Sequence, residues 1–254
     1  MRARPAAGWV LGAALAALGA LAAAALPVGA GPPAPAQVAE GDQVDEGRRL
    51  YQTGCASCHG PEARGTARGP NLQGVGAAAV DFWVSTGRMP LERDTRFAVR
   101  KPPSYDREQI DALVAYLTSL DPSGPEIPEI DPAAADLVEG GVLYRANCAA
   151  CHGAVGIGGA LAQARHAPPL GPATPLQVAE AIRIGPGAMP SFGPETFDDE
   201  QLSAIVKYVE ALDSPEDPGG LGLGHTGPIP EGFVGWLVGL GVVLVAAWWI
   251  GDRE

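Results

Sequence analysis

The chain has 254 residues and a formal net charge of −12, which argues against a nucleic-acid-binding protein. An acidic surface does not suit nucleic acid, whose phosphates need a basic face. The length allows two small domains, since single domains usually have about 100 to 150 residues. The 35 glycines and 25 prolines approach the level that indicates disorder, but the apolar residues that recur with helical spacing argue against a disordered chain.

The first 30 residues are apolar and Ala-rich behind a basic start, Arg2 and Arg4. A signal peptide has an apolar core of about 7 to 15 residues and a small-residue cleavage site, which Val28-Gly29-Ala30 resembles. A spanning helix needs about 20 apolar residues, which this segment exceeds. Residues 1–30 are therefore predicted to be a signal peptide or a transmembrane helix, and in both cases the chain beyond residue 30 is exported. Residues 31–44 are predicted to be a linker.

All four cysteines lie in two C-x-x-C-H motifs, Cys55-Ala56-Ser57-Cys58-His59 and Cys148-Ala149-Ala150-Cys151-His152. This spacing is typical of covalent c-type haem attachment, with two thiols for thioether bonds and an adjacent histidine for the iron. A zinc ribbon needs two C-x-x-C pairs about 15 to 20 residues apart, whereas these pairs are 93 residues apart. A thioredoxin-like redox pair would lie in a βαβ pattern, which the sequence does not show.

The segments before the two motifs form an internal repeat. Glu46-Gly47-Arg48-Arg49-Leu50-Tyr51 precedes the first motif and Glu139-Gly140-Gly141-Val142-Leu143-Tyr144 precedes the second, with Glu, Gly, Leu and Tyr matched at an offset of 93 residues. Such a repeat indicates two copies of one module. We place the modules at residues 45–121 and 137–213, joined by residues 122–136, whose prolines predict a semi-rigid linker.

Each motif is followed by a Gly-rich loop and a proline, Pro70 in the first module and Pro168 in the second. An iron-ligating imidazole usually donates its other N–H to a carbonyl or a carboxylate. We expect the carbonyl groups of Pro70 and Pro168 to accept these bonds. The alternative is that both are ordinary turn prolines.

Apart from the initiator, the only methionines are Met89 and Met189, each preceded by a Gly-containing loop and followed by proline. Methionine most often fills gaps in a core, but Met/His coordination is the arrangement that raises the haem potential in cytochromes c. One methionine at the matching place in each module favours ligation by thioether sulfur. The spacing from histidine to methionine is 30 residues in the first module and 37 in the second, so we expect the two distal sides to differ.

Each module is predicted to end with an amphipathic helix, because apolar residues recur there with helical spacing. These residues are Ile110, Leu113, Val114, Leu117 and Leu120 in the first module and Leu202, Ile205, Val206, Val209 and Leu212 in the second. Ser104 and Thr196 precede the two helices and are predicted to be their N-caps.

The C-terminal part contains a predicted linker, residues 214–232, and then residues 233–250, eighteen residues without a charge. At about 1.5 Å per residue a helix of this length spans roughly 27 Å, close to the hydrocarbon thickness of a bilayer. It is therefore predicted to be a transmembrane helix. His166 and His225 lie in Gly/Pro-rich loops and are given no ligand role.

Several of these segments resemble a known family. They are the stretch Cys55 to Gly60, Gly69-Pro70-Asn71-Leu72, Val84 to Pro90, the run Cys148 to His152, Gly158 to Leu161, Ala167-Pro168, Met189-Pro190 and Gly227 to Gly232. Together they are similar to the dihaem cytochrome c subunit of actinobacterial menaquinol–cytochrome c reductase, a cytochrome bc complex. The resemblance covers nearly the whole chain from about Glu46 onward.

The resemblance implies a mostly α fold, with two tandem cytochrome c domains, an N-terminal signal or membrane segment and a C-terminal transmembrane helix. It implies a place in the cell membrane, with the haem domains on the extracytoplasmic side. It also implies two covalently bound haem c groups. Their expected ligands are Cys55, Cys58, His59 and Met89 for the first haem and Cys148, Cys151, His152 and Met189 for the second.

The family's function implies that electrons from a Rieske iron–sulfur subunit enter the first haem, cross to the second and leave to the copper centre of an aa3-type oxidase. Cytochrome b is the other expected partner. The chain would thus be a redox subunit of a quinol–cytochrome c reductase without bond-making catalytic residues.

Two other functions are left open by the sequence. A dihaem enzyme such as a thiosulfate dehydrogenase or a peroxidase has similar paired motifs, but a catalytic haem normally needs a displaceable or absent sixth ligand, which Met89 and Met189 argue against. A dihaem electron-transfer subunit of another oxidase or of a membrane dehydrogenase is the second alternative.

Overall fold

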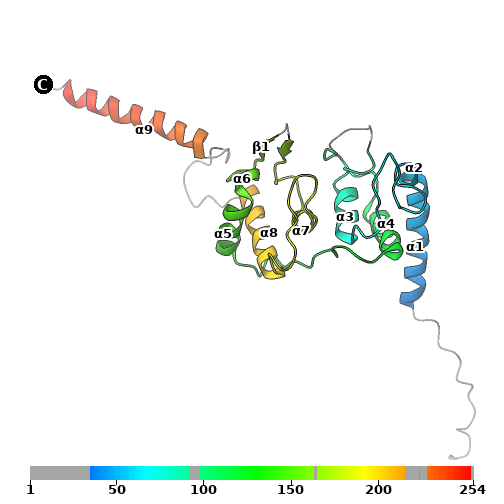
Figure 1. The fold of residues 1–254 in the computed structure, drawn as a ribbon. Coiled ribbons are helices and arrows are strands. Elements are labelled where there is room, and N and C mark those ends of the chain that lie inside the picture. Colours follow the sequence, from blue (N-terminus) through cyan, green and yellow to red (C-terminus); the bar gives the residue numbers. More distant parts are fainter. Residues whose placement is uncertain (1–34, 92–97, 163–164, 215–222, 224–227, 253–254) are drawn as a thin grey trace, which may run out of the picture. The chain divides into compact units, whose positions relative to one another are not determined.

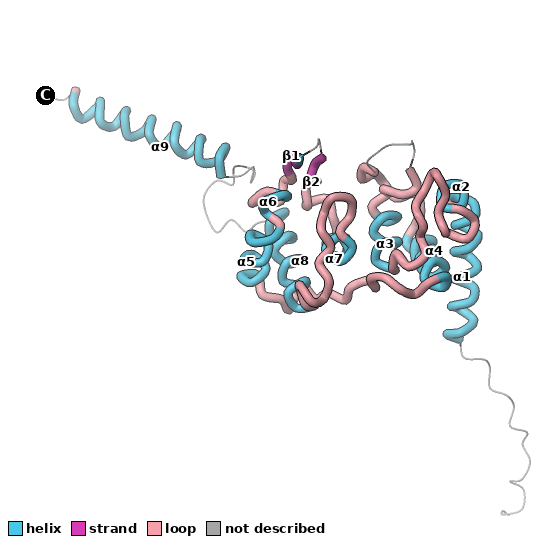
Figure 2. Tube along the Cα trace, viewed as in Figure 1, coloured by secondary structure: helices cyan, strands magenta, loops and turns pink. Residues whose placement is uncertain are grey.

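The computed structural model describes residues 35–91, 98–162, 165–214, 223 and 228–252, and these are mostly helical (Figures 1 and 2). The first module contains α1 (Pro35–Gly54), α2 (Ala56–His59), α3 (Ala77–Ser85) and α4 (Arg107–Leu120). The second contains α5 (Leu137–Asn147), α6 (Ala149–His152), β1 (Gly159–Leu161), β2 (Arg165–Ala167), α7 (Pro175–Ile184) and α8 (Asp199–Asp213), and α9 (Pro228–Gly251) comes after it. Residues 1–30 and His225 lie outside the described residues.

The two modules use the same order of helices, as the sequence repeat predicts. A long helix leads into a one-turn helix that holds the C-x-x-C-H motif, a third helix precedes the methionine, and an amphipathic helix closes the module. In both closing helices the predicted apolar face is buried, with Leu113 and Ile205 each 1% exposed. Burial of this face supplies the main stabilisation of each small core.

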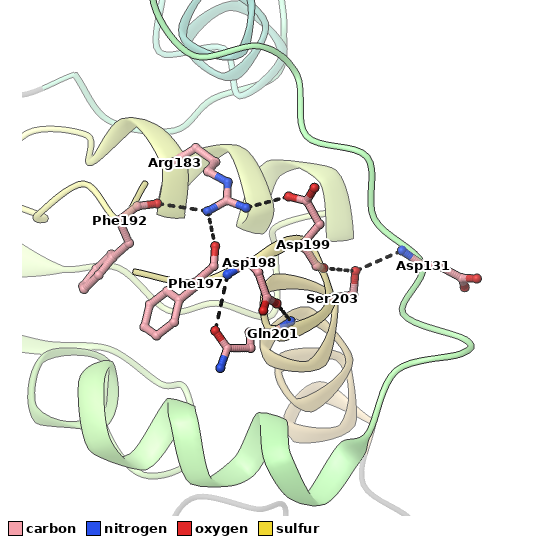
Figure 3. Close-up of polar contacts among 8 residues, drawn as sticks. All are labelled: Asp131, Arg183, Phe192, Phe197, Asp198, Asp199, Gln201 and Ser203. Carbon is pink, nitrogen blue, oxygen red and sulfur yellow. Dashed lines mark hydrogen bonds and ion pairs between the residues drawn. The ribbon is translucent and has the colours of Figure 1, made fainter. Parts of the chain in front are cut away.

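Aspartates, and not the predicted Ser104 and Thr196, cap the closing helices. The Asp106 side chain accepts a hydrogen bond from the backbone N–H of Gln109 at 2.9 Å. The Asp198 side chain accepts the equivalent bond from the backbone N–H of Gln201 at 2.8 Å (Figure 3). In each case the glutamine side chain bonds back to the aspartate N–H, which completes a capping box. Only a residue three positions before the glutamine can form this reciprocal pair, and the serine and threonine lie two residues too early.

The glycine matched in the repeat lies where the first helix of each module crosses the closing helix. A Cβ atom on Gly47 would overlap the carbonyl oxygen of Ala112, and one on Gly140 would overlap that of Ala204. One turn further along, the rings of Tyr144 and Tyr208 lie 5.3 Å apart. The repeated glycine therefore permits a close helix crossing that positions the start of each haem motif.

Two of the predicted linkers, residues 31–44 and 122–136, contain more structure than the sequence predicts, and most of the third, residues 214–232, lies outside the described residues. Helix α1 begins at Pro35, inside residues 31–44. Between the modules, Pro125 O accepts a hydrogen bond from Ala78 N at 3.1 Å, and Asp131 N donates one to Ser203 Oγ at 3.1 Å (Figure 3). The segment 122–136 is thus bonded to the first module near its start and to the second module near its end.

The second module carries a hairpin where the sequence predicts only a Gly-rich loop. Strands β1 and β2 pair antiparallel, with Gly159 opposite Ala167. His166 lies on β2, exposed, with Nδ1 3.0 Å from Gly159 O. The hairpin accounts for the longer stretch between histidine and proline in this module.

Helix α9 begins five residues before the predicted span and runs for 24 residues, which corresponds to about 36 Å. Residues Ile229–Gly251 are long and apolar enough to cross a membrane, with a mean hydropathy of 2.2. Large apolar side chains such as Trp236 and Trp248 are exposed along it. This is the exposure expected of a helix whose solvent is lipid.

Candidate haem-binding sites

Each C-x-x-C-H motif forms a single helical turn that continues from the preceding helix. In the first module Cys55 N donates to Tyr51 O at 2.8 Å and His59 N donates to Cys55 O at 3.0 Å. In the second module Cys148 N donates to Tyr144 O at 2.8 Å and His152 N donates to Cys148 O at 2.9 Å. Side chains three positions apart in a helical turn lie on one face, so both thiols of each motif are presented on the same side.

The histidine of each motif is oriented by the carbonyl group of the expected proline. His59 Nδ1 lies 2.9 Å from Pro70 O, and His152 Nδ1 lies 3.1 Å from Pro168 O. Because a carbonyl oxygen only accepts, Nδ1 carries a proton in both rings, and in the neutral imidazole the lone pair is then on Nε2. A neutral imidazole held through Nδ1 is the form that binds iron through Nε2.

A buried tyrosine connects the helix before each motif to the turn after it. Tyr51 donates its hydroxyl proton to Gly60 O at 2.7 Å, and Tyr144 donates to Gly153 O at 2.7 Å. Burial is the main reason that the pKa of Tyr51 is raised to about 12, and burial also raises the pKa of Tyr144. Both phenols therefore stay protonated and remain donors, which fixes the position of the histidine between them and the proline loop.

The first thiol of each motif has a raised pKa. Burial, together with the smaller effect of the second cysteine, raises the pKa of Cys55 to about 11 and that of Cys148 to about 11. Cysteines of thiol–disulfide redox motifs have lowered pKa values, because the thiolate is their reactive form. The raised pKa of the first cysteine in each motif therefore argues against a thioredoxin-like redox site.

In the second module, a buried arginine fixes the loop that carries Met189 (Figure 3). Arg183 on α7 donates to Phe192 O at 3.3 Å and to Phe197 O at 2.7 Å, and it pairs with Asp199 at 2.8 Å. The loop between Met189 and α8 is thereby tied at two points, and Met189 packs against the core of the module. The role of Arg183 could not be predicted from the sequence, because an arginine on an amphipathic helix is usually a surface residue.

The first module has the same ion pair with the signs exchanged. Asp81 on α3 is 2% exposed, and Arg107, the first residue of α4, binds it at 2.7 Å and 3.1 Å. Arg107 and Asp199 are each the first residue of the closing helix, whereas Asp81 and Arg183 lie at different turns of α3 and α7. An ion pair between the helix before the methionine and the closing helix is therefore present in both modules. It is bidentate in the first and consists of the single contact between Arg183 Nη2 and Asp199 Oδ1 in the second.

Met89 comes after α3 and a short turn. Met89 N donates to Trp83 O at 2.9 Å, and Lys101 Nζ donates to Pro90 O at 2.8 Å. Met89 is half-buried, and residues 92–97 beyond it lie outside the described residues. Each module thus combines two thiols on one face, an imidazole with a free Nε2 and a methionine on a tethered loop, and this donor set fits a covalently attached haem.

Comparison with known proteins places the chain in a family. Residues 44–121 match the family model "Cytochrome c", and residues 135–209 match "Cytochrome C oxidase, cbb3-type, subunit III". The cytochrome bc1 complex cytochrome c subunit of Mycobacterium leprae is 42% identical over 216 residues, which cover 82% of this chain and 74% of that protein. That of Corynebacterium diphtheriae is 37% identical over 244 residues, which cover 86% of each. The chain belongs to the cytochrome c subunits of the cytochrome bc1 complex.

A more distant relative of this cytochrome c subunit is a cbb3-type cytochrome c oxidase subunit CcoP of Azospirillum. It is 28% identical over 188 residues, which cover 65% of this chain and 61% of that protein. The two family models confirm two cytochrome c domains, and the names of the relatives confirm a role in electron transport.

A buried acid of the cytochrome c subunit lies where its two domains meet, between α3 and α7. Gln177 Nε2 donates to Ser85 Oγ across this seam at 3.1 Å. Glu180, also on α7, is 0% exposed, and neither carboxyl oxygen has a hydrogen-bond partner among the described residues. Burial, together with the smaller effect of the negative charge of Asp81, raises the pKa of Glu180 to about 9, with Arg107 acting in the opposite direction. Glu180 is therefore a neutral acid at pH 7.

This raised pKa makes the stability of the cytochrome c subunit depend on pH. The unfolded chain loses the Glu180 proton near the ordinary pKa of 4.5, whereas the folded chain keeps it until about pH 9. Between these values the folded state holds more protons, so the free energy of unfolding falls as pH rises, by up to about 1.4 kcal/mol per pH unit. We expect Glu180→Gln to remove this fall and to be more stable than the wild type at pH 8.

Urea unfolding of the full chain in detergent from pH 5 to 9 measures the effect. Glu210→Gln, at an exposed position on α8, is the matched control and should keep the wild-type slope. Parallel profiles for the wild type and Glu180→Gln would contradict the assignment.

Proposed function

We propose that this subunit relays electrons, outside the cytoplasm, from a Rieske iron–sulfur subunit to an aa3-type terminal oxidase, with one covalently bound haem c in each domain. The observation that carries the proposal is the duplicated donor set. Each domain presents two thiols on one helical turn, an imidazole held through Nδ1 and a methionine on a tethered loop. A single site would suit a simple carrier, whereas two sites in one chain suit a relay.

The residues have distinct roles in this proposal. Cys55 and Cys58 would form the thioether bonds of the first domain, and His59 Nε2 and Met89 sulfur would bind the iron. Cys148, Cys151, His152 and Met189 take the same roles in the second. When bound, each haem would supply a one-electron iron couple, and ligation by both methionine and histidine would raise its potential. Pro70 and Pro168 act through the histidines, since they fix the ring orientation and the tautomer.

The apolar segments near the two ends of the chain support a place at the membrane. Helix α9 would tether the domains to the membrane, and the basic start of residues 1–30 would stay on the cytoplasmic side. The domains between them would then lie on the extracytoplasmic side, where they can reach cytochrome b, the Rieske subunit and an oxidase. The second candidate, an electron-transfer subunit of an oxidase, is favoured by the cbb3-type match of residues 135–209.

Substitution of Met189 tests the ligand assignment. In Met189→Ala, the potential of one haem should fall while that of the other is little changed, because thioether ligation stabilises the reduced iron. Redox titration of the full chain measures both potentials. Leu170→Ala, which also removes a side chain packed on the second core, is the control for a cavity alone. Equal potentials in Met189→Ala and Leu170→Ala would show that Met189 only fills the core.

Copurification tests the place of the subunit in a complex. The tagged chain, extracted in mild detergent, should bring with it cytochrome b, a Rieske protein and subunits of an aa3-type oxidase, as identified by mass spectrometry. Recovery of a cbb3-type oxidase without cytochrome b would favour the second candidate, and recovery with neither would remove both.

A further inference from the structure

Helix α5 has exposed apolar side chains on the side opposite to its buried face. The buried residues of α5 are Gly140, Gly141 and Tyr144. On the other side of the helix, Val138 is 74% exposed and Val142 is 55% exposed. A single exposed valine needs no explanation, but side chains four positions apart in a helix are neighbours, so these two form one apolar surface.

This surface continues as far as the haem motif of the second domain. We define the apolar row as four exposed residues that follow one another at intervals of four, Val138, Val142, Ala146 and Ala150. The turn of the motif continues the helix, because Cys148 N donates to Tyr144 O at 2.8 Å. Ala150 lies between the two cysteines of the motif, and Cys151 is itself exposed. A protein bound on the apolar row would therefore lie against the turn that is proposed to attach the second haem.

The first domain has polar residues on the same surface. At the offset of 93 residues, the counterparts of the apolar row are four exposed residues of α1 and α2, namely Asp45, Arg49, Thr53 and Ser57. Solubility alone favours polar residues on both surfaces. The apolar residues of the second domain therefore indicate a contact that the first domain does not make.

The charges beside the apolar row are negative. Asp136 is exposed directly before α5 and caps it, since its side chain accepts from Val138 N at 2.7 Å. Arg145, the one basic residue of α5, is turned toward α8, where its guanidinium carbon lies 5.8 Å from the centre of the Tyr208 ring. Residues 137–213 contain eight aspartates and glutamates but four lysines and arginines. Anionic lipid repels such a domain, whereas a protein contact with an apolar centre and a basic rim suits it.

We propose that the apolar row is the docking site of the protein that accepts electrons from the second haem, and that this acceptor has basic residues around an apolar contact. The proposal rests on the proposed function, which takes the acceptor to be an aa3-type oxidase. One electron would pass from the reduced iron of the second haem to the oxidised acceptor, with no bond made or broken. Because the first domain has a polar surface at these positions, the acceptor would bind beside the second haem alone.

Substitution of Val142 by a charge of either sign tests the proposal. The full chain in nanodiscs, reduced with ascorbate, is mixed with purified aa3-type oxidase, and stopped flow measures the oxidation rate of the haems against oxidase concentration. We expect Val142→Arg and Val142→Asp each to raise the half-saturating oxidase concentration about tenfold or more, because either charge would be buried in the apolar contact. Both haem potentials should stay unchanged. Effects of opposite sign for the two variants would show that the oxidase responds to charge alone, and would overturn the proposal.

Thr53→Arg and Thr53→Asp are the matched controls, because Thr53 is exposed on the polar surface of the first domain. Val142 variants that behave like these controls would overturn the proposal. So would an unchanged half-saturating concentration together with weaker self-association or weaker binding to phosphatidylglycerol vesicles, which would assign the row to a second copy or to lipid.

A second pair of variants covers a failure to mature. If the Val142 variants do not mature, Ala146→Arg and Ala146→Asp, at the counterpart of Thr53, are measured by the same criteria. A wild-type chain that holds two haems but is not oxidised by the oxidase would instead refute the proposed function, whatever the variants do.

Discussion

The hydrogen bond from histidine Nδ1 to a proline carbonyl is the interaction on which both sites depend. It fixes the tautomer, leaves Nε2 as the only metal-binding atom of the ring, and sets the ring plane relative to the two thiols. Other features support this bond. On one side of the histidine, a tyrosine hydroxyl binds the turn that follows, as Tyr51 does when it donates to Gly60 O at 2.7 Å. On the other side, a Cβ on Gly69 would lie 3.0 Å from His59 Nδ1, so glycine gives the loop room to approach.

Both domains contain this hydrogen bond between histidine and proline, and they differ in the structure around it. An ion pair joins the helix before the methionine to the closing helix in both domains, with the signs exchanged: Asp81 with Arg107 in one domain and Arg183 with Asp199 in the other. The second domain adds a hairpin, and the first has Arg88 directly before its methionine where the second has Ala188. These differences give the two haems of the proposed relay different surroundings with the same ligand types.

The fold and the hydrogen bonds from both histidines to the proline carbonyls could be predicted from the sequence, because each depends on local spacing. The C-x-x-C-H motif, the apolar periodicity of the closing helices and the repeat around Tyr51 and Tyr144 are all visible within short windows. The prediction of Ser104 and Thr196 as N-caps is wrong, since residue type alone does not locate a capping box, which depends on a glutamine three residues later. Glu180 and Arg183 could not be found, because their burial results from the packing of α7 against elements distant in sequence. A sign-exchanged pair is likewise invisible to a comparison of residue types.

The central claim is that each domain holds iron between an imidazole nitrogen and a thioether sulfur. Iron K-edge X-ray absorption of the oxidised full chain measures the iron neighbours directly. We predict two irons per chain and, averaged over both, one sulfur for every iron in its first coordination shell beside five nitrogens. A sulfur count near one half would show that only one methionine is a ligand, and a shell without sulfur would contradict the claim for both domains.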